Sequence, residues 1–207
     1  MDDCTVFVVD DDPAMRESLK FLMDSVGIGV ETFESAQDFL DRYQPERPGC
    51  LVLDVRMPGM SGLDLQEVLA HRGILVPVII ITGYGDVPMA VRAMKGGALD
   101  FIEKPFTDQA LLDKVNTALE IDKTWRREGK EMAHVEERHD RLTDREKEVM
   151  EKVLVGKPNK VIASELGLSH KTVEVHRSRV MDKMEVQSLA DLLRTVILYR
   201  ARTGRLT

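Results

Sequence analysis

Five polar residues end or follow apolar, strand-like runs in the first half of the chain. They are two neighbouring carboxylates, a third carboxylate, a hydroxyl and a lysine: Asp10, Asp11, Asp54, Thr82 and Lys104. Three converging carboxylates repel one another, so the set predicts a divalent cation, and Mg²⁺ suits carboxylate oxygens completed by a phosphoryl group. Asp54 is then placed to act as a nucleophile toward a phosphoryl donor, with Lys104 pairing with the phosphoryl oxygens and Thr82 donating a hydrogen bond to them.

The elements that position these residues are predicted by hydrophobic periodicity over residues 1–120. Short apolar runs alternate with amphipathic stretches of helical period, and these runs lie at 5–10, 30–33, 50–54, 76–82 and 99–103. Five strands alternating with five helices predict an α/β fold, a doubly wound five-stranded parallel sheet covered on both faces. The mixed runs at 30–33 and 99–103 suit its edges. Because ligands gather at the carboxyl ends of such strands, the five polar residues are expected to meet there.

The charge of the chain is unevenly distributed. Residues 1–120 carry 10 Lys and Arg against 21 Asp and Glu, whereas residues 157–207 carry 10 against 5. An acidic part and a basic end indicate different partners, and the basic end favours nucleic acid. The acidic start and the absence of about 18 consecutive apolar residues predict no membrane segment and a place in the cytoplasm. Cys4 and Cys50 match no metal or redox spacing, so we expect buried thiols.

Residues 121–141 are predicted to form a helical linker. Sparse apolar positions in a highly charged background, among them Trp125 and Met132, continue the helical pattern of the preceding segment, with Gly129 as a weak point. A solvated spacer and a dimer-forming coiled coil account for this pattern equally well, because the heptad pattern is short.

The C-terminal part, residues 142–207, shows a helical pattern throughout. Gly156 and Gly167 are predicted to end its first two helices, and Asn159 and Ser169 to cap the helices that follow them. A helix closed by glycine, a short turn and a second helix with a polar face predict a helix–turn–helix unit.

Four segments of the acidic part, VVDDDPAMR, LDVRMPGMSG, IITGYGD and DFIEKPF, resemble the receiver domain of two-component response regulators. The resemblance covers residues 3 to about 120. It implies a metal shell of one Mg²⁺ and a phosphoryl site, made by the acidic pair Asp10 and Asp11, the phosphoacceptor Asp54, the backbone carbonyl of Arg56, the hydroxyl of Thr82 and the amine of Lys104.

The same resemblance implies a conformational switch formed by Thr82 and Phe101. Phe101 lacks the hydroxyl of the tyrosine often found at this position, so it can act through packing alone. The Lys104–Pro105 bond is expected to be cis, which only a bond to proline tolerates cheaply. Arg56 and Tyr84, each two residues after a site residue, are expected to overhang the phosphoryl group and slow its hydrolysis.

The segment from Leu142 to Met184 resembles the four-helix LuxR-type DNA-binding domain of NarL and FixJ regulators, and the whole chain is nearest to the FixJ-like branch. Base-facing positions fall on Glu174, Val175 and Ser178. Positions near phosphates fall on Lys160, Lys171, Thr172, His176, Arg177 and Arg179. Glu174 departs from the basic or neutral residue expected there, because an acid can accept from cytosine but repels phosphate.

Together these resemblances imply a transcription factor of a two-component system with three parts: a receiver (1–120), a helical linker (121–141) and a DNA-binding domain (142–207). Phosphorylation is expected to promote dimerisation and promoter binding. The implied partners are a sensor histidine kinase, double-stranded DNA, RNA polymerase and a second copy of the chain, and no membrane. The chain is not expected to be an enzyme beyond its own phosphorylation and slow dephosphorylation.

Two other functions compete with this interpretation. A Mg²⁺-dependent phosphatase of the dehalogenase-like kind also uses a strand-end Asp, but such enzymes carry an acid two residues later, where this chain has Arg56. A constitutive DNA-binding protein with an inactive receiver is the second, and the complete polar set argues against it.

Overall fold

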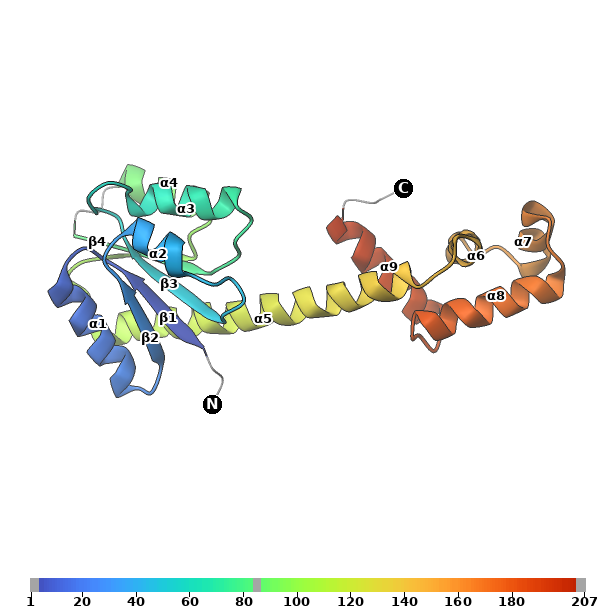
Figure 1. Ribbon diagram of the computed structural model, residues 1–207, viewed down its shortest axis with the longest axis horizontal. Coiled ribbons are helices and arrows are strands. Elements are labelled where there is room, and N and C mark those ends of the chain that lie inside the picture. The colour runs from blue at the N-terminus through green and yellow to red at the C-terminus, as the bar shows by residue number, and fades with distance from the viewer. Residues whose placement is uncertain (1–3, 84–86, 204–207) are drawn as a thin grey trace. The chain divides into compact units, whose positions relative to one another are not determined.

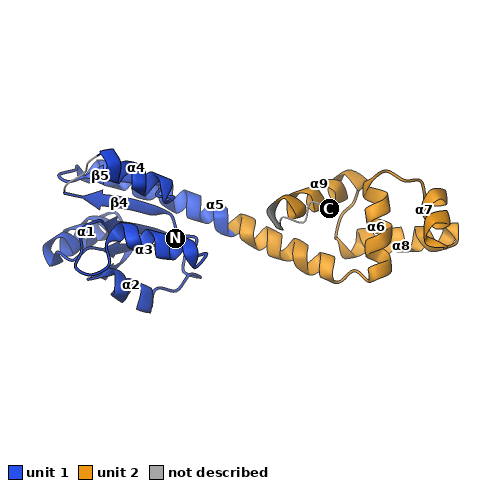
Figure 2. Ribbon diagram, turned by 90° about the horizontal axis from the view of Figure 1, so that it is seen from above, with its two compact units in different colours: residues 1–126 blue, residues 127–207 orange. Residues whose placement is uncertain are grey.

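The computed structural model describes residues 4–83 and 87–203. It divides into two compact units, Met1–Arg126 and Arg127–Thr207, which Figure 2 shows in blue and orange. Each unit has its own apolar core.

The first unit is built on a five-stranded parallel sheet (Figure 1). Its strands are β1 (Thr5–Val9), β2 (Gly29–Phe33), β3 (Gly49–Asp54), β4 (Val78–Thr82) and β5 (Asp100–Glu103). The order across the sheet is β2-β1-β3-β4-β5, so the two mixed runs form the edges and the apolar runs are central, as predicted. The doubly wound fold predicted from the alternation of strands and helices is confirmed.

Helices cover both faces of this sheet. They are α1 (Pro13–Ser25), α2 (Ala36–Arg42), α3 (Gly62–His71), α4 (Val87–Lys95) and the first part of α5 (Asp108–Asp140). Helices α1 and α5 pack on one face around Val6, Val8 and Val52, whereas α2, α3 and α4 pack on the other around Phe7 and Leu51. Alternate residues of the central strands therefore enter opposite cores, which explains why these strands are apolar throughout.

Cys50 on β3 and Cys4, just before β1, are free thiols. Cys50 is buried and Cys4 is half-buried, so the expectation of buried thiols holds fully for Cys50 alone. Burial, together with the nearby charge of Asp122, raises the pKa of Cys50 far above its ordinary value, which makes this thiol unreactive.

Helix α5 is one continuous helix past Gly129, as the linker pattern predicts. Within the first unit it is fastened by Asp122, whose carboxylate accepts the Gly49 amide at 2.9 Å and the Arg126 Nε–H at 2.7 Å. Within the second unit, Val135 packs against the core and the His139 ring stacks on Tyr199. The apolar positions of this part of the linker thus serve the chain's own C-terminal core.

The described residues of the second unit form four further helices: α6 (Asp144–Leu154), α7 (Asn159–Leu166), α8 (His170–Lys183) and α9 (Leu189–Thr203). Gly156 and Gly167 follow the ends of α6 and α7 with φ of 76° and 64°, where only glycine is unstrained, so the predicted helix ends are confirmed. Ser169 caps α8 through the Thr172 amide, also as predicted. The predicted cap at Asn159 is wrong, because Pro158 holds that position and Asn159 is the first helical residue.

A capping box opens α6. Thr143 accepts the Glu146 amide and the buried Glu146 carboxylate accepts the Thr143 amide, while Lys183 donates to the same carboxylate at 2.6 Å. Burial alone would raise the pKa of Glu146, but the donors from Lys183 and Thr143 outweigh it and lower this pKa below its ordinary value.

We expect Thr143→Ala to destabilise the second unit by about 1 kcal/mol, the usual cost of losing a helix cap.

The buried Glu146 carboxylate should make the stability of this unit depend on pH. Because the pKa of Glu146 is lowered on folding, its contribution to stability is present above the pKa of an unfolded Glu and is lost as pH falls through the pKa of the folded state. Thermal melting at pH 7 and pH 3 measures this. Glu146→Gln should cost stability at pH 7 and little at pH 3, and an equal loss at both would contradict the assignment.

Candidate functional site

Three of the predicted polar residues meet at the carboxyl ends of β1, β3 and β5. Lys104 donates from Nζ to Asp10 Oδ2 at 2.8 Å and to Asp54 Oδ1 at 2.7 Å. Asp10 and Asp54 are 1% and 5% exposed. A half-buried lysine thus bridges two buried carboxylates from neighbouring strands, and it lies 94 positions after Asp10 and 50 after Asp54 in the sequence.

Backbone contacts hold the site in place. The Lys104 amide donates to the Thr82 carbonyl at 2.7 Å, which ties the residue after β5 to the end of β4. Gly62, the first residue of α3, lies so close to β3 that a Cβ on it would stand 2.1 Å from the Asp54 carbonyl oxygen. Only glycine permits this approach, which accounts for a glycine eight residues after Asp54.

The remaining carboxylate oxygens accept backbone amides. Asp10 Oδ1 accepts the Asp12 amide at 2.9 Å, and Asp54 Oδ2 accepts the Arg56 amide at 2.7 Å. Burial raises the pKa of Asp54 above its ordinary value, against the lowering effect of Lys104. For Lys104, burial would lower the pKa, but the hydrogen bonds to Asp10 and Asp54 outweigh it and raise the pKa. Lys104 therefore stays protonated, and two carboxylates face one cation.

This donor set fits a magnesium ion. Mg²⁺ is held by one or two carboxylates together with water and phosphoryl oxygens, and Asp10 and Asp54 supply two buried carboxylates with one net negative charge beyond Lys104. Asp11 is exposed. In the described part of the chain no three His, Cys, Asp or Glu side chains stand close enough to hold a metal, so Asp11 is not brought into this group.

The other predicted residues of the receiver lie around this group. Thr82 is fully buried at the end of β4, and Phe101 on β5 is half-buried and packs against the core beneath α3 and α4. Arg56 is exposed. The Lys104–Pro105 bond is cis, as expected. Tyr84, expected to overhang the phosphoryl group, lies outside the described residues.

One residue beside the site was not predicted. Arg16, on the first turns of α1, donates from Nη1 to the Asp10 carbonyl at 2.7 Å and so braces the loop that carries the acidic pair. The signal in the sequence was weak, because an arginine one turn into a helix is usually a solvated charge. Asp12, next to the acidic pair, caps α1 through the Ala14 amide.

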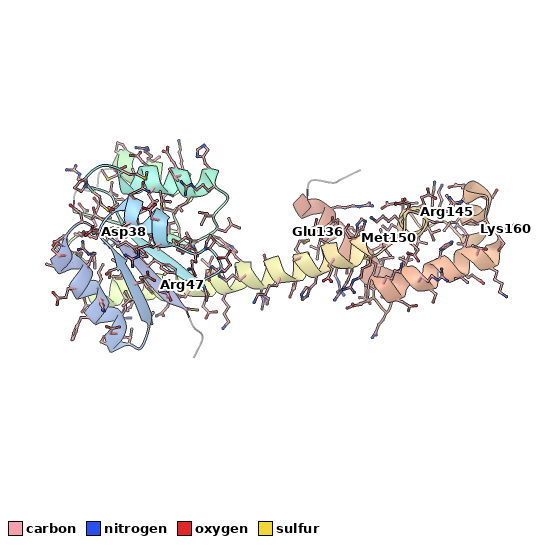
Figure 3. All side chains as sticks on the ribbon, in the orientation of Figure 1. Asp38, Arg47, Glu136, Arg145, Met150 and Lys160 are labelled. Atoms are coloured by element: carbon pink, nitrogen blue, oxygen red, sulfur yellow. The ribbon has the colours of Figure 1, made fainter. Side chains whose placement is uncertain are left out.

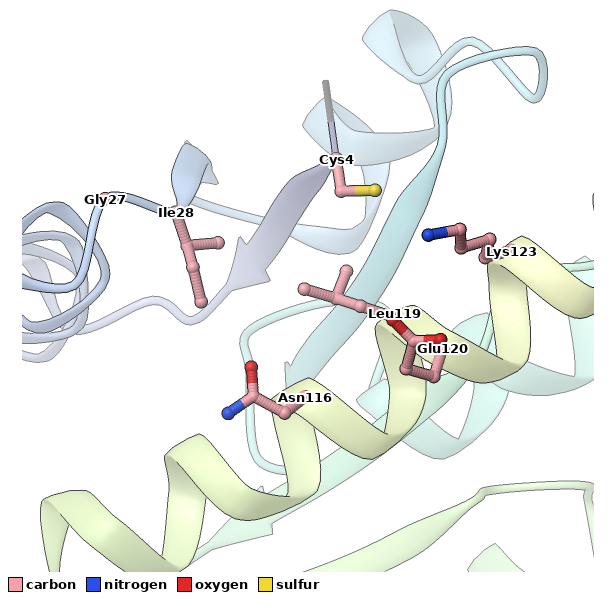
Figure 4. Close-up of a pocket in the computed structure, with 7 residues that line it drawn as sticks. All are labelled: Cys4, Gly27, Ile28, Asn116, Leu119, Glu120 and Lys123. Carbon is pink, nitrogen blue, oxygen red and sulfur yellow. The ribbon is translucent and has the colours of Figure 1, made fainter. Parts of the chain in front are cut away.

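A surface cavity of about 400 Å³ lies at the opposite end of the sheet. Figure 4 shows its lining, which includes Cys4 before β1, Ile28 before β2, and Asn116, Glu120 and Lys123 on α5. These residues adjoin the amino ends of the strands. The cavity therefore contributes nothing to the group at Asp54.

The second unit presents a polar helix face. Val173 and Val180 of α8 and Met184, which caps its C-terminal end, are buried in the core, as predicted for the inner side. The opposite side exposes the predicted DNA contacts Lys171, Glu174, Val175, Ser178 and Arg179. Lys160 on α7, labelled in Figure 3, is exposed as well.

Four members of the predicted DNA-contact set have partners or partial burial within the unit. Thr172 is half-buried and its hydroxyl contacts Ser169 Oγ at 2.8 Å. His176 is half-buried, and its Nδ1 has no hydrogen-bond partner among the described residues. Arg177 Nη1 donates to Asn159 Oδ1 at 2.7 Å. Glu174 lies 3.5 Å from His170 Nδ1, so a protonated His170 would offset its charge.

Comparisons with known proteins agree with this arrangement. The response regulator receiver domain family matches residues 6–116, and the luxR family of bacterial regulatory proteins matches residues 140–196. The chain is 51% identical to nodulation protein W of Bradyrhizobium diazoefficiens, over 91% of this chain and 83% of that one. It is 48% identical to the transcriptional regulatory protein FixJ of Azorhizobium caulinodans, over 93% and 92%. The solved structure of the response regulator StyR matches with a TM-score of 0.87 and 47% identity, over 95% of this chain and all of that one.

A receiver followed by a LuxR-type unit defines a class of transcriptional regulators that act in two-component systems. The chain belongs to the NarL/FixJ family of response regulators and is FixJ-like. No helix among the described residues is long and apolar enough to cross a membrane.

Proposed function

We propose that this regulator is switched by Mg²⁺-dependent phosphorylation of Asp54, which promotes dimerisation and promoter binding. The observation that carries the proposal is the bridge from Lys104 to Asp10 and Asp54. It brings a nucleophile, a cation and a second carboxylate to one point at the end of the sheet.

Each residue has a role in the proposed reaction. The Asp54 oxygen that Lys104 contacts attacks the phosphorus of a phosphohistidine or a small phosphodonor, and the bond from phosphorus to the donor breaks. Lys104 can then exchange its carboxylate contact for a phosphoryl oxygen, and the Thr82 hydroxyl can donate to another. Asp10, Asp54 and the Arg56 carbonyl would hold Mg²⁺, with the exposed side chain of Asp11 turning toward them, and the ion would supply positive charge to the developing charge on the phosphoryl oxygens.

The acceptor is not an efficient hydrolase in this proposal. Arg56 stands where a dehalogenase-like phosphatase has its second acid, so no carboxylate at that position activates water. A slowly hydrolysed phosphoaspartate is what a switch requires. Thr82 and Phe101 would link the phosphoryl group to the surface of α4 and β5.

For DNA, we propose that α8 enters the major groove. Glu174, Val175 and Ser178 face base edges, and the exposed Lys160, Lys171 and Arg179 lie near phosphates. Thr172 and His176 complete the proposed contacts, whereas Arg177, whose Nη1 donates to Asn159 Oδ1, is not assigned a phosphate contact. The three parts of the chain in this proposal are residues 1–120, 121–141 and 142–207.

The further partners are a cognate sensor histidine kinase, RNA polymerase at the promoter, and a second copy of the chain. A regulator that binds promoter DNA works in the cytoplasm of a bacterial cell, and we place this protein there. The similarity to transcriptional regulatory proteins supports this set.

One experiment tests the proposal as a whole. The protein is incubated with a small phosphodonor, with and without Mg²⁺, and its intact mass and DNA binding are measured. We expect one added phosphoryl group only with Mg²⁺, and tighter DNA binding in that sample. Rapid turnover without accumulation would favour a phosphatase, and equal DNA binding in all samples would favour a constitutive DNA-binding protein.

A further inference from the structure

The helix–turn–helix is a pair of helices that diverge from one turn. Helix α7 ends at Leu166, Gly167 adopts the left-handed conformation, and α8 begins at His170 after the Ser169 cap. This turn therefore constrains the angle between α7 and α8 where the end of α7 meets the start of α8. Figure 2 shows α7 beside the start of α8 in the orange unit.

A second contact joins the two helices away from the turn. Arg177 Nη1 donates to Asn159 Oδ1 at 2.7 Å. Asn159 and Arg177 each lie eight residues into their helix when counted from the turn, which at 1.5 Å per residue is about 12 Å along each one. The hydrogen bond is thus the third side of a triangle whose other sides are the two helices.

Arg177 also borders the apolar core of the unit. It lines a residual cavity of about 10 Å³ together with Val149, Met150 and Val153 of α6, Leu192 of α9, and Val180 and Met181 of α8 itself. Its head donates to Asn159 of α7. Arg177 therefore lies where α8 faces residues of α6 and α9, while its head contacts α7.

Asn159 is free to serve this contact because it does not cap α7. It is the first helical residue, and the Pro158 cap makes no side-chain hydrogen bond. The amide oxygen of Asn159 accepts from a charged donor in a half-buried position, a stronger kind of hydrogen bond than one between neutral groups.

We infer that Asn159 and Arg177 form a brace that fixes the angle of the recognition helix, and that Arg177 serves DNA recognition as a positioning residue. The inference rests on the proposed function of α8. Its consequence is a loss of sequence-specific affinity when the brace is removed, because base-edge contacts depend on the helix angle and phosphate contacts tolerate small changes.

The test uses the phosphorylated full chain and a DNA duplex that the wild-type protein selects from a random pool, with a scrambled duplex for comparison. The variants are Asn159→Ala, Arg177→Met, which keeps the apolar stem, and the double variant. Lys160→Ala, in which a neighbouring exposed lysine is removed, is the matched control. Thermal melting of each variant reports the fold.

We expect each brace variant to bind the selected duplex about tenfold more weakly and the scrambled duplex within twofold of wild type. The double variant should be no weaker than either single one, because both remove the same contact. The dependence of binding on salt should stay unchanged. In Lys160→Ala both duplexes should weaken together and the salt slope should fall by about 0.9 for each lost phosphate contact.

Three results would contradict the inference that this contact acts as a brace. They are additive effects in the double variant, a fall in the salt slope for Arg177→Met, and an unchanged ratio of binding to the selected and scrambled duplexes in Asn159→Ala. If Arg177→Met melts much below wild type, Asn159→Ala alone decides the question. If the wild-type protein selects no duplex, the proposed function fails instead, and the two failures are distinguishable.

Discussion

Asp54→Asn is expected to abolish phosphoryl transfer to this protein completely. The amide keeps the shape of the side chain and can still accept from Lys104, but it lacks the anionic oxygen that attacks phosphorus. With a small phosphodonor and Mg²⁺, the intact mass of the wild-type protein should rise by one phosphoryl group and that of the variant should not change. DNA binding of the variant should not respond to the phosphodonor.

The fold of this variant should survive at neutral pH. Burial raises the pKa of Asp54, so its favourable contribution to folding is present below the pKa of an unfolded Asp and is lost as pH rises through the folded pKa. At pH 7 Asp54 is ionised, and burying its charge costs stability. The neutral amide of Asn removes this cost, so the melting temperature of the variant should not fall. Asp41→Asn, which changes an exposed carboxylate of α2, is the control and should be phosphorylated normally. Labelling that persists in Asp54→Asn would place the acceptor elsewhere.

The sequence predicts the ends of the strands well because residue types change abruptly there. Apolar runs stop at Asp10 and Asp54, and a parallel sheet brings these stops to one edge. The pairing of Lys104 with both carboxylates could not be predicted, because it depends on the register of β1, β3 and β5 relative to one another in the sheet. A shift of one residue in register would reverse the direction of each side chain.

Local signals were ambiguous where several residues can fill one role. Asn159 has the right type for a helix cap, but the helix starts one residue earlier, after Pro158, and the amide binds a side chain 18 residues away. Arg16 and Arg177 are likewise arginines whose partners come from other elements. Periodicity reports which face of a helix is apolar and gives no information on such polar pairs.

The linker shows the same limit. The pattern around Met132 and Val135 is compatible with a coiled coil or a solvated spacer, and periodicity cannot name the surface that an apolar face will contact. In the structure, Val135 packs against the core of the second unit, and Met132 borders a cavity with Thr195 and Leu198 of α9. Because Val135 is engaged within one chain, we look for dimerisation on the receiver first.

The receiver offers an apolar surface for that purpose. On α4, Val87, Val91 and Met94 are 77%, 45% and 50% exposed. This helix follows β4, whose last residue is Thr82. A movement of Thr82 toward a phosphoryl group, with Phe101 filling the space behind it, would change the surface formed by α4 and β5. Moving a population from 1:99 to 99:1 takes about 5.5 kcal/mol of differential interaction.

We therefore expect phosphorylation to convert a monomer into a dimer that pairs through α4 and β5. Sedimentation with and without phosphodonor measures this. Val91→Glu should be phosphorylated and remain a monomer, because a charge at the centre of the apolar surface would have to be desolvated on pairing. Phe21→Glu, which places the same charge at an exposed apolar residue of α1, should dimerise as wild type does.

Dimerisation should also change DNA binding in a specific way. Two recognition helices about one DNA turn apart double the number of phosphate contacts, so the dependence of affinity on salt should become roughly twice as steep on phosphorylation. Val91→Glu should keep the shallow slope of the unphosphorylated protein. A monomer in both phosphorylation states would exclude this mechanism. A dimer in both states would instead place the pairing surface outside the part of the receiver that responds to Asp54.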